Sequence, residues 1–388
     1  MTPPRRFVIL SNVYDENYQK ARGEEVPPCL SSPKRRDLFT AIQLALGWEL
    51  VVLSSPPRAS IRRHGRWLPP VDTRFDRFPQ HVCANWDLPK LRIPFSWLMY
   101  AFHVARRVRT GDVLMVDNFE LIYVLAAWLC RLLYGSPVLL DYEDGKHLTD
   151  RGWARLISGP AEAWGKPLIQ GAILAHPALG ARLAEKIPKI TVPGFYKPTV
   201  ARIPPDRQGP VRFVYAGSLD KPRGIDLLIG ALPHLPNQGW QLDITGAGPL
   251  EKSVRQLANT PRFQGKVFFH GVLPAQEHAK LLAACHVGLN LQLSSDPISS
   301  VTFPSKIFSY FSAGLEVIST MASQVKALLG DACSYPAAET PDSLASCMAR
   351  RIEPEISARA PSSLLDRFTI QNTSQMLCDF FQRVQGSN

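Results

Sequence analysis

The segment 303–314, FPSKIFSYFSAG, carries residue types that bind anions in proteins. Pro304 and Ser305 suit the start of a helix, and Gly314 suits its end. A helix N-terminus offers unpaired N–H groups and a partial positive charge, so Ser305 and Lys306 are well suited to hold a diphosphate. The alternative is an ordinary capped helix with a solvated lysine.

Glycines end three successive strand-like runs in the second half of the chain, at Gly217, Gly246 and Gly271. The loop after the first run offers three polar side chains, Ser218, Lys221 and Arg223. Glycine lets the backbone approach a ligand closely, so three such strand ends predict a shared binding edge. Taken singly, each glycine is also explained by a tight turn.

Short apolar runs alternate with segments of helical period, a pattern typical of βαβ units with parallel sheets. In the first half we expect strands at 7–10, 49–53, 112–116, 137–141 and 172–175, and helices at 36–47, 94–109, 119–134 and 177–187. In the second half we expect strands at 212–217, 240–246, 266–271, 287–293 and 316–320, each followed by a helix. The pattern appears twice, which predicts an α/β fold with two Rossmann-like domains.

The domain boundaries follow from composition. We predict an N-terminal domain over 1–192, a proline-rich linker over 193–210, a second domain over 211–355 and a helical C-terminal segment over 356–388. Two such domains make a cleft, and ligands of open α/β sheets lie beyond the carboxyl ends of the strands.

Composition narrows the class of protein. The 388 residues are 45% hydrophobic and 20% charged, as in a folded protein. The seven cysteines are odd in number and form no CxxC pair, which argues against a disulfide framework and a zinc site. The N-terminus enters a strand-like run without a signal-peptide pattern, and no apolar run is long enough to span a bilayer, so we expect a cytoplasmic protein. The net charge of +11 permits an anionic partner.

Four segments, in their order and spacing, resemble the C-terminal domain of family 4 glycosyltransferases of the GT-B fold. They cover residues 216–232, 243–250, 267–290 and 303–320, and the similarity extends over about 210–330. The resemblance implies two Rossmann-like domains facing each other across a cleft, a nucleotide-sugar donor, and no metal or other cofactor. It also implies that the helical tail crosses back to the N-terminal domain.

The resemblance assigns roles to individual residues. A basic pair neutralises the leaving nucleoside diphosphate in this family; its lysine-like position falls on Arg223, whereas Ser218 occupies the arginine-like position and Lys221 is a possible substitute. The backbone of Gly271, Val272 and Leu273 is expected to contact the base. The segment that holds Thr302, Phe303, Ser305 and Lys306 is expected to contact the diphosphate.

The chain departs from the family at two glutamates spaced E-x7-E, which contact the donor sugar and the ribose hydroxyls. Val301 and Ser309 occupy these positions. A serine hydroxyl offers one neutral bond where a carboxylate accepts two. Either ribose binding is weaker, or another acid such as Asp296 or Glu316 replaces the carboxylate, or catalysis has been lost; a surface role is the simpler interpretation of both acids.

Residues at the strand ends of the first half are candidates for the acceptor side. Glu143 and Asp144 follow the strand at 137–141 and can orient an acceptor hydroxyl or the donor sugar, or simply cap a helix. We assign Asn12 and Tyr14, which follow the first strand, to acceptor binding. The spacing of the acids in DYED also resembles a DxD metal motif, although the GT-B resemblance argues against a metal.

Arginine-rich segments beside aromatic residues suggest an anionic membrane surface as a partner. They contain Arg58, Arg62, Arg63, Arg66, Arg106 and Arg107. The alternatives are a solvated basic face or, less expected, nucleic acid, for which no recognition motif is present.

The sequence therefore predicts a glycosyltransferase that moves a sugar from a nucleotide donor to a hydroxyl of a glycan or lipid-linked glycan, with retention favoured. Its location would be the cytoplasm, including the inner face of the membrane. The alternatives are a catalytically silent GT-B protein that binds a glycan or a partner, and a GT-B epimerase or phosphorylase.

Overall fold

The computed structural model describes residues 5–23, 32–57, 67–86, 92–145, 150, 152–198, 209–353 and 363–386. The chain forms two compact units. Unit 1 comprises residues 1–192 and 370–388, and unit 2 comprises residues 193–369.

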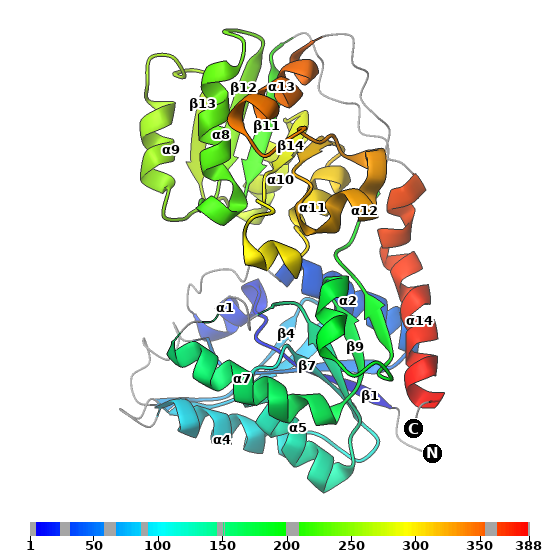
Figure 1. Cartoon of the computed structure of the whole chain (residues 1–388). Coiled ribbons are helices and arrows are strands. Elements are labelled where there is room, and N and C mark those ends of the chain that lie inside the picture. The colour runs from blue at the N-terminus through cyan, green and yellow to red at the C-terminus, as the bar shows by residue number, and fades with distance from the viewer. Residues whose placement is uncertain are drawn as a thin grey trace. The chain divides into compact units, whose positions relative to one another are not determined.

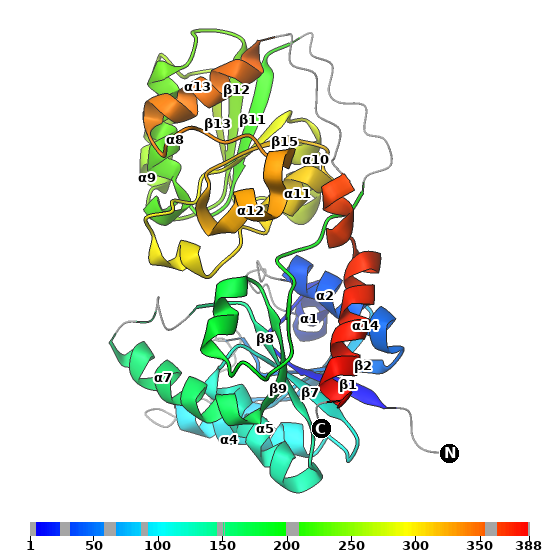
Figure 2. The same ribbon diagram turned by 45° about the vertical axis from the view of Figure 1, so that its right-hand side comes forward.

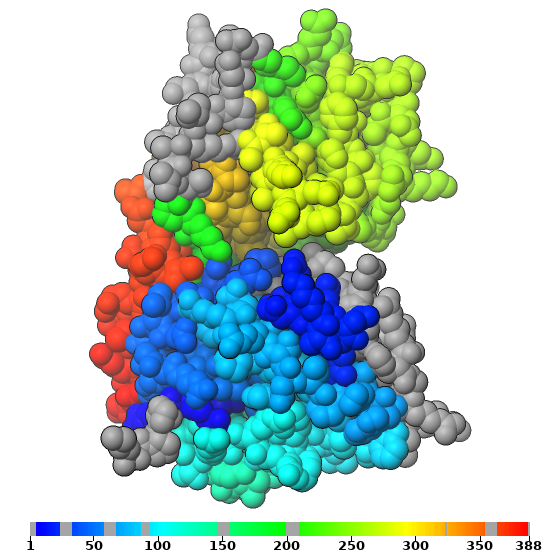
Figure 3. All heavy atoms as spheres, turned by 180° about the vertical axis from the view of Figure 1, so that it is seen from behind, coloured from blue at the N-terminus to red at the C-terminus, as the bar shows by residue number. Residues whose placement is uncertain are grey.

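Unit 1 is built on an eight-stranded sheet in the order β10-β9-β8-β7-β1-β2-β5-β4. The strands are β1 (Arg6–Leu10), β2 (Glu49–Ser54), β4 (Val71–Phe75), β5 (Phe78–Val82), β7 (Val113–Asp117), β8 (Val138–Tyr142), β9 (Ile169–Leu174) and β10 (Lys189–Thr191). All neighbours are parallel except β4 and β5, which form an antiparallel pair at one edge. Figure 3 shows this edge, in light blue, at the surface of unit 1. The central strands are continuous apolar runs because both faces of the sheet are covered by helices.

The helices of unit 1 form two layers. Those that the structure describes are α1 (Glu16–Arg22), α2 (Ser32–Leu46), α4 (Arg92–Ala105), α5 (Leu121–Tyr134), α7 (Trp153–Gly165) and α14 (Ile370–Gly386). In Figures 1 and 2, α4, α5 and α7 lie along one side of the sheet, and α2 and α14 lie against the other. The last helix thus belongs to unit 1, where Phe381 packs edge-on against Phe7 of β1.

Several features of unit 1 differ from the sequence prediction, which gave no strand at β4, β5 or β10. The helix expected at 177–187 is a short 3₁₀ helix over Pro177–Arg182, which leads into β10. The helices α1 and α7 were not predicted. Nor was the small antiparallel pair of β3 (Trp67–Leu68) and β6 (Asn85–Trp86).

Unit 2 contains a five-stranded parallel sheet in the order β13-β12-β11-β14-β15. The strands are β11 (Val211–Ala216), β12 (Trp240–Thr245), β13 (Val267–Gly271), β14 (Val287–Asn290) and β15 (Glu316–Ser319). The helices between and after them are α8 (Ile225–Ala231), α9 (Glu251–Ala258), α10 (Ala275–Ala283), α11 (Lys306–Ser312), α12 (Val325–Leu329) and α13 (Pro341–Ile352). Both units are Rossmann-like, which confirms the predicted α/β class.

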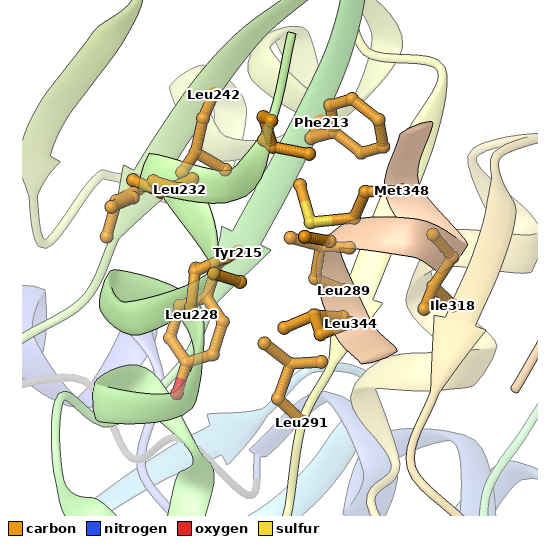
Figure 4. Packing of buried hydrophobic residues seen from close by; sticks show 14 of the residues in the cluster. Phe213, Tyr215, Leu228, Leu232, Leu242, Leu289, Leu291, Ile318, Leu344 and Met348 are labelled. Atoms are coloured by element: carbon orange, nitrogen blue, oxygen red, sulfur yellow. The ribbon is translucent and has the colours of Figure 1, made fainter. Parts of the chain in front are cut away.

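The core of unit 2 fixes the strand ends in place. Figure 4 shows Phe213 and Tyr215 of β11 beside Leu228 of α8 and Met348 of α13, all fully buried. Burial of such side chains contributes about 1.5–3 kcal/mol each. On the other face of the sheet, Tyr310 of α11 donates a hydrogen bond to the Leu289 carbonyl, 3.3 Å away, and accepts one from the Ala216 N–H at 2.9 Å. The helix α11 is therefore held firmly against β11 and β14.

The predicted linker at 193–210 is described only in part, because 199–208 lie outside the described residues. Residues 193–198 have no regular secondary structure and pack within unit 2. The Tyr196 N–H donates to the Phe368 carbonyl at 2.9 Å.

Candidate functional site

Three glycines come together at the carboxyl edge of the sheet in unit 2. The N–H of Gly246, after β12, donates to the carbonyl of Gly271, at the end of β13, over 2.8 Å. A Cβ at Gly246 would overlap the carbonyl oxygen of Gly217, so only glycine fits between these strand ends. The space around the missing Cβ of Gly271 is open. The predicted glycine edge is thus a tightly packed corner with one open side.

The loop after β11 is held by Asp220. This residue caps the 3₁₀ turn Lys221–Arg223 and accepts hydrogen bonds from the Arg223 N–H at 3.0 Å and from the Ser218 hydroxyl at 2.6 Å. Ser218 therefore has a partner within its own loop, and Lys221 is exposed at the start of the turn. The turn ends at Gly224, whose φ is +72° and whose missing Cβ would overlap the Leu291 carbonyl oxygen.

The guanidinium group of Arg223 is positioned by Gln292, which the sequence analysis missed. Arg223 Nη1 donates to Gln292 Oε1 over 2.5 Å. Gln292 is buried just beyond β14, and its amide nitrogen donates to the hydroxyls of Ser299 at 2.9 Å and Thr302 at 3.3 Å. Its place at the carboxyl end of a strand was the available sequence signal.

Lys306 is the first residue of α11, and its ammonium group lies at the same edge. Nζ is 3.4 Å from the point where a Cβ of Gly217 would lie, and 4.6 Å from the centre of the Tyr215 ring. No carboxylate of the described residues lies within the 4.0 Å of an ion pair from this nitrogen. Burial, together with repulsion from Arg223, lowers the pKa of Lys306 to about 7, and attraction to the Asp220 carboxylate offsets only part of this shift. The site thus holds a partly buried cation that a bound anion would stabilise in its charged form.

The residues around Lys306 differ in which of their atoms are accessible to a ligand. Ser305 is exposed and makes no side-chain cap, so the predicted capping role of its hydroxyl is absent. The hydroxyl of Thr302 donates back to the Ile298 carbonyl at 2.9 Å. Phe303 is buried against Phe308, which leaves only its backbone for a ligand. Because α11 is only seven residues long, Lys306 and its surroundings define the site better than the helix end does.

The two positions that depart from the E-x7-E pattern have different environments. Val301 is buried, whereas Ser309 is exposed on α11. Of the two acids considered as replacements, Glu316 is the first residue of β15. It therefore lies at the amino ends of the strands, away from their carboxyl ends, and pairs with Arg351 at 2.8 Å. Asp296 caps a short turn by accepting from the Ile298 N–H at 2.9 Å. Glu316 is thus engaged by Arg351, and Asp296 by the turn that it caps.

Val272 and Leu273 follow β13. Val272 is well exposed and Leu273 is partly buried. They stand beside the open side of Gly271, where a planar group can contact the backbone.

In unit 1 the predicted acids Glu143 and Asp144 lie at the carboxyl end of β8. Their N–H groups both donate to the Asn118 side-chain oxygen at 2.9 Å, and Glu143 forms an ion pair with Lys34 at 2.7 Å. Asn118 adopts a φ of +53°, a conformation more common for asparagine than for most other residues. The carboxylate charge of Glu143 is therefore balanced by Lys34, whereas Asp144 is more exposed.

A buried ion pair lies at the same edge of the sheet as these acids, and the sequence analysis did not predict it. Arg35 of α2 binds both carboxylate oxygens of Asp117, the last residue of β7, and the Ser11 hydroxyl donates to Asp117 Oδ2 at 3.0 Å. Asp141 of β8 is fully buried nearby, and burial and repulsion from Glu143 raise its pKa well above the ordinary range. These contacts fix the carboxyl edge of the sheet.

Asn12 and Tyr14, assigned to the acceptor, follow β1 and differ in exposure. Asn12 is exposed and accepts from the Ser55 hydroxyl at 2.7 Å. Tyr14 is buried, its ring lies tilted against that of Tyr18, and its hydroxyl donates to the Ser55 carbonyl. Only Asn12 thus presents an accessible side chain.

The basic segments are described unevenly. Arg58, Arg62, Arg63 and Arg66 lie outside the described residues. Arg106 is exposed over the ring of Phe102, whereas Arg107 is partly buried and has Asp72 3.7 Å away. Across the described part of the chain, no three His, Cys, Asp or Glu side chains gather as a metal-holding group, and no helix is long and apolar enough to cross a membrane.

A protein-family model matches most of unit 2. Residues 210–353 match the family model described as "Glycosyl transferases group 1". No curated protein matches the chain closely enough in sequence to indicate a relative.

Solved structures of similar fold extend over the whole chain. The Anabaena protein HepE in complex with UDP and glucose is 13% identical, with 97% of this chain and 99% of that chain covered and a TM-score of 0.69. Sucrose-phosphate synthase from Thermosynechococcus elongatus is 13% identical, with coverages of 99% and 100% and a TM-score of 0.70. The lipopolysaccharide outer core galactosyltransferase WaaB is 14% identical, with 99% of each chain covered and a TM-score of 0.60. The chain therefore has the GT-B fold, and residues 210–353 of its second unit are similar to group 1 glycosyl transferases.

Proposed function

We propose that this protein is a glycosyltransferase whose unit 2 binds a nucleoside diphosphate sugar and whose unit 1 provides the acceptor site. The observation that carries the proposal is the pair of cations at the carboxyl edge of unit 2. Lys306 and Arg223 are close enough to repel each other, and no carboxylate of the described residues pairs with either within 4.0 Å. Two such cations suit a diphosphate, which carries two negative charges and becomes more negative as it leaves the sugar.

The chemistry of the site follows from where the charge develops. As the bond between the sugar and the diphosphate breaks, negative charge grows on the leaving oxygen. Arg223, oriented by Gln292, and Lys306 then stabilise this charge without a metal ion. The exposed backbone around Gly271 and Val272 suits the base. UDP is the first nucleotide to test, because complexes of HepE contain UDP or UDP-glucose.

The proposal includes finer points. We place the protein in family 4, with retention of configuration, metal independence and a glycan or lipid-linked acceptor in polysaccharide or cell-surface glycan synthesis. Ribose binding relies on Ser309 and the backbone, because Val301 and Ser309 replace the two carboxylates. We also propose a cytoplasmic location with peripheral association to an anionic membrane surface, in which the exposed Arg106 takes part.

A second candidate is a catalytically silent GT-B protein that binds a nucleotide, a glycan or a partner. The buried Val301 and the exposed Ser309, in place of carboxylates, favour it. Under this alternative the cations still bind an anion, but no sugar is transferred.

Turnover of UDP-glucose and UDP-galactose separates the two candidates. Release of UDP from the wild type, with and without glycan acceptors, is compared with Arg223→Ala and with Lys280→Ala, a matched variant at an exposed lysine of α10. We expect Arg223→Ala to lower the rate by about 100- to 1000-fold and Lys280→Ala to leave it unchanged. Near-normal turnover by Arg223→Ala contradicts the assigned site, and binding without turnover by the wild type favours the silent protein.

A further inference from the structure

The helices α4, α5 and α7 of unit 1 expose rows of large apolar side chains. On α4 the row is Leu98 and Phe102, on α5 it is Trp128 and Leu132, and on α7 it is Leu156 and Trp164. The two residues of each row are separated by four or eight positions, as on one side of a helix. One leucine from each row, Leu98, Leu132 and Leu156, is 68%, 76% and 64% exposed, respectively. These six residues are called the apolar face below.

The three rows belong to one continuous layer. The helix α4 packs along α5, and α5 packs along α7, as Figures 1 and 2 show. The Trp128 indole N–H donates to the Trp164 carbonyl at 3.0 Å, which ties α5 to α7. At the other end of the layer, Trp86 of β6 packs edge-on against Phe95 of α4. The opposite sides of α4 and α5 are already buried, so these helices are apolar nearly all round.

The exposed charges on the three helices and at their ends have one sign, and the exposed acid beside them is Asp72, which lies 3.7 Å from Arg107 just beyond α4. The helices α4 and α5 contain no acid at all. The single acid of α7, Glu162, is buried and paired with Lys166 and Arg182, each at 2.8 Å. The exposed charges are arginines, namely Arg106 at the end of α4, Arg131 on α5 and Arg155 on α7.

We propose that the apolar face, with its arginine rim, docks on the surface of an anionic lipid bilayer. Leucine and phenylalanine side chains at such a surface enter the boundary between head groups and acyl chains, and tryptophans prefer the same depth. Arginine extends its charged end toward lipid phosphates while its stem covers apolar surface. None of the described helices is built to span the bilayer, so the three helices lie on it. This inference deepens the proposed membrane association and does not depend on the transfer reaction.

Vesicle binding without any nucleotide sugar tests the proposal. The full chain is sedimented with vesicles of phosphatidylcholine alone, or with a large share of phosphatidylglycerol. The test variant combines Leu98→Ser, Phe102→Ser and Leu132→Ser. The matched control combines Leu44→Ser and Met376→Ser, exposed apolar residues of α2 and α14 on the other side of the sheet.

We expect the wild type to bind vesicles with phosphatidylglycerol more tightly than neutral ones. The triple variant should lose at least about tenfold in partition coefficient, since each side chain removes apolar contact with the acyl region. Arg106→Gln should lose about fivefold on anionic vesicles only. The control should bind as the wild type does, and all variants should keep its melting temperature, because the changed side chains are exposed.

Two results would overturn the proposal. One is wild-type binding that is no greater on phosphatidylglycerol than on phosphatidylcholine, or that the triple variant retains. The other is a wild-type dimer in sedimentation velocity that the triple variant turns into a monomer, without vesicle binding by either, which would make the apolar face an interface between copies. Failure of vesicle binding would leave turnover of a nucleotide sugar unaffected, so the two proposals fail separately.

Discussion

Lys306 is the residue whose charge state the proposed donor site uses most directly. Burial and repulsion from Arg223 lower its pKa to about 7, so in the absence of an anion it loses its proton near neutral pH. A bound diphosphate favours the ammonium form and raises this pKa. Binding is therefore expected to take up a proton above neutral pH.

This coupling predicts how donor affinity depends on pH. Both states are protonated below the free pKa of about 7, so affinity is full there. Above it, affinity falls by up to about tenfold per pH unit until the pKa of the bound state is reached. Calorimetric titration with UDP-glucose, whose phosphates stay ionised throughout, measures this from about pH 6 to about pH 9.

Lys306→Arg is the control for the pH profile, because arginine stays charged over this range. Its affinity for UDP-glucose should be nearly flat with pH. A profile that falls in parallel with the wild type would assign the titration to another group.

At the residue scale the sequence identified some side chains and missed others. Lys306 and Arg223 were predicted from their place after strands and from the family resemblance, and the structure places both at one edge. Gln292 and the Arg35–Asp117 pair were not predicted, because their partners are distant in sequence and a lone glutamine or arginine carries no pattern. The sequence also did not predict that Asn12 is exposed and Tyr14 buried, since both follow the same strand.

At the scale of elements, Gly224 connects the turn that carries Arg223 to α8. Its φ of +72° disfavours any side chain, and a Cβ would overlap the Leu291 carbonyl oxygen. Gly265 has a similar φ of +76°, but its surroundings are open. Comparing the same substitution at the two glycines therefore separates the cost of backbone strain from the cost of a steric clash.

We expect Gly224→Ala to lower the free energy of unfolding by more than about 2 kcal/mol, because strain and clash add. Gly265→Ala should cost only about 1 kcal/mol, from strain alone. Urea denaturation of both variants measures the difference, and equal losses would contradict the close packing of Gly224 against the Leu291 backbone, just beyond β14.

The elements themselves were largely predictable where they are long and apolar. Every strand of unit 2 coincides with a predicted run, and only β11 begins one residue before its run, because buried parallel strands read as continuous apolar segments. The segment 177–187 was misread, since its helical spacing is satisfied by a short 3₁₀ turn before β10. The small β3 and β6 strands were missed because two residues give no periodicity.

At the scale of the whole molecule, unit 1 contains both ends of the chain. The helix α14 packs on α2 and β10, and Val384 and Phe380 fill the space beside Gly171 of β9. Such an arrangement makes the stability of unit 1 depend on its last residues.

We expect Phe381→Ala to destabilise unit 1 by about 3–5 kcal/mol, because the ring is buried against Phe7. Met376→Ala, on the exposed side of the same helix, should change stability by less than about 0.5 kcal/mol. Thermal denaturation followed by circular dichroism measures both. If the two variants melt alike, α14 contributes little to unit 1.

The central claim is that Lys306 and Arg223 bind the diphosphate of a nucleotide sugar. Its most direct test is the melting temperature of the wild type, Arg223→Ala, Lys306→Met and the control Lys280→Met with UDP-, GDP-, ADP- and CMP-linked sugars. Ligand at about 100 times its Kd adds about 2.7 kcal/mol of stability. The account predicts a rise with one donor class for the wild type and Lys280→Met that both site variants lose; a rise that Arg223→Ala and Lys306→Met retain, or no rise with any donor, would contradict it.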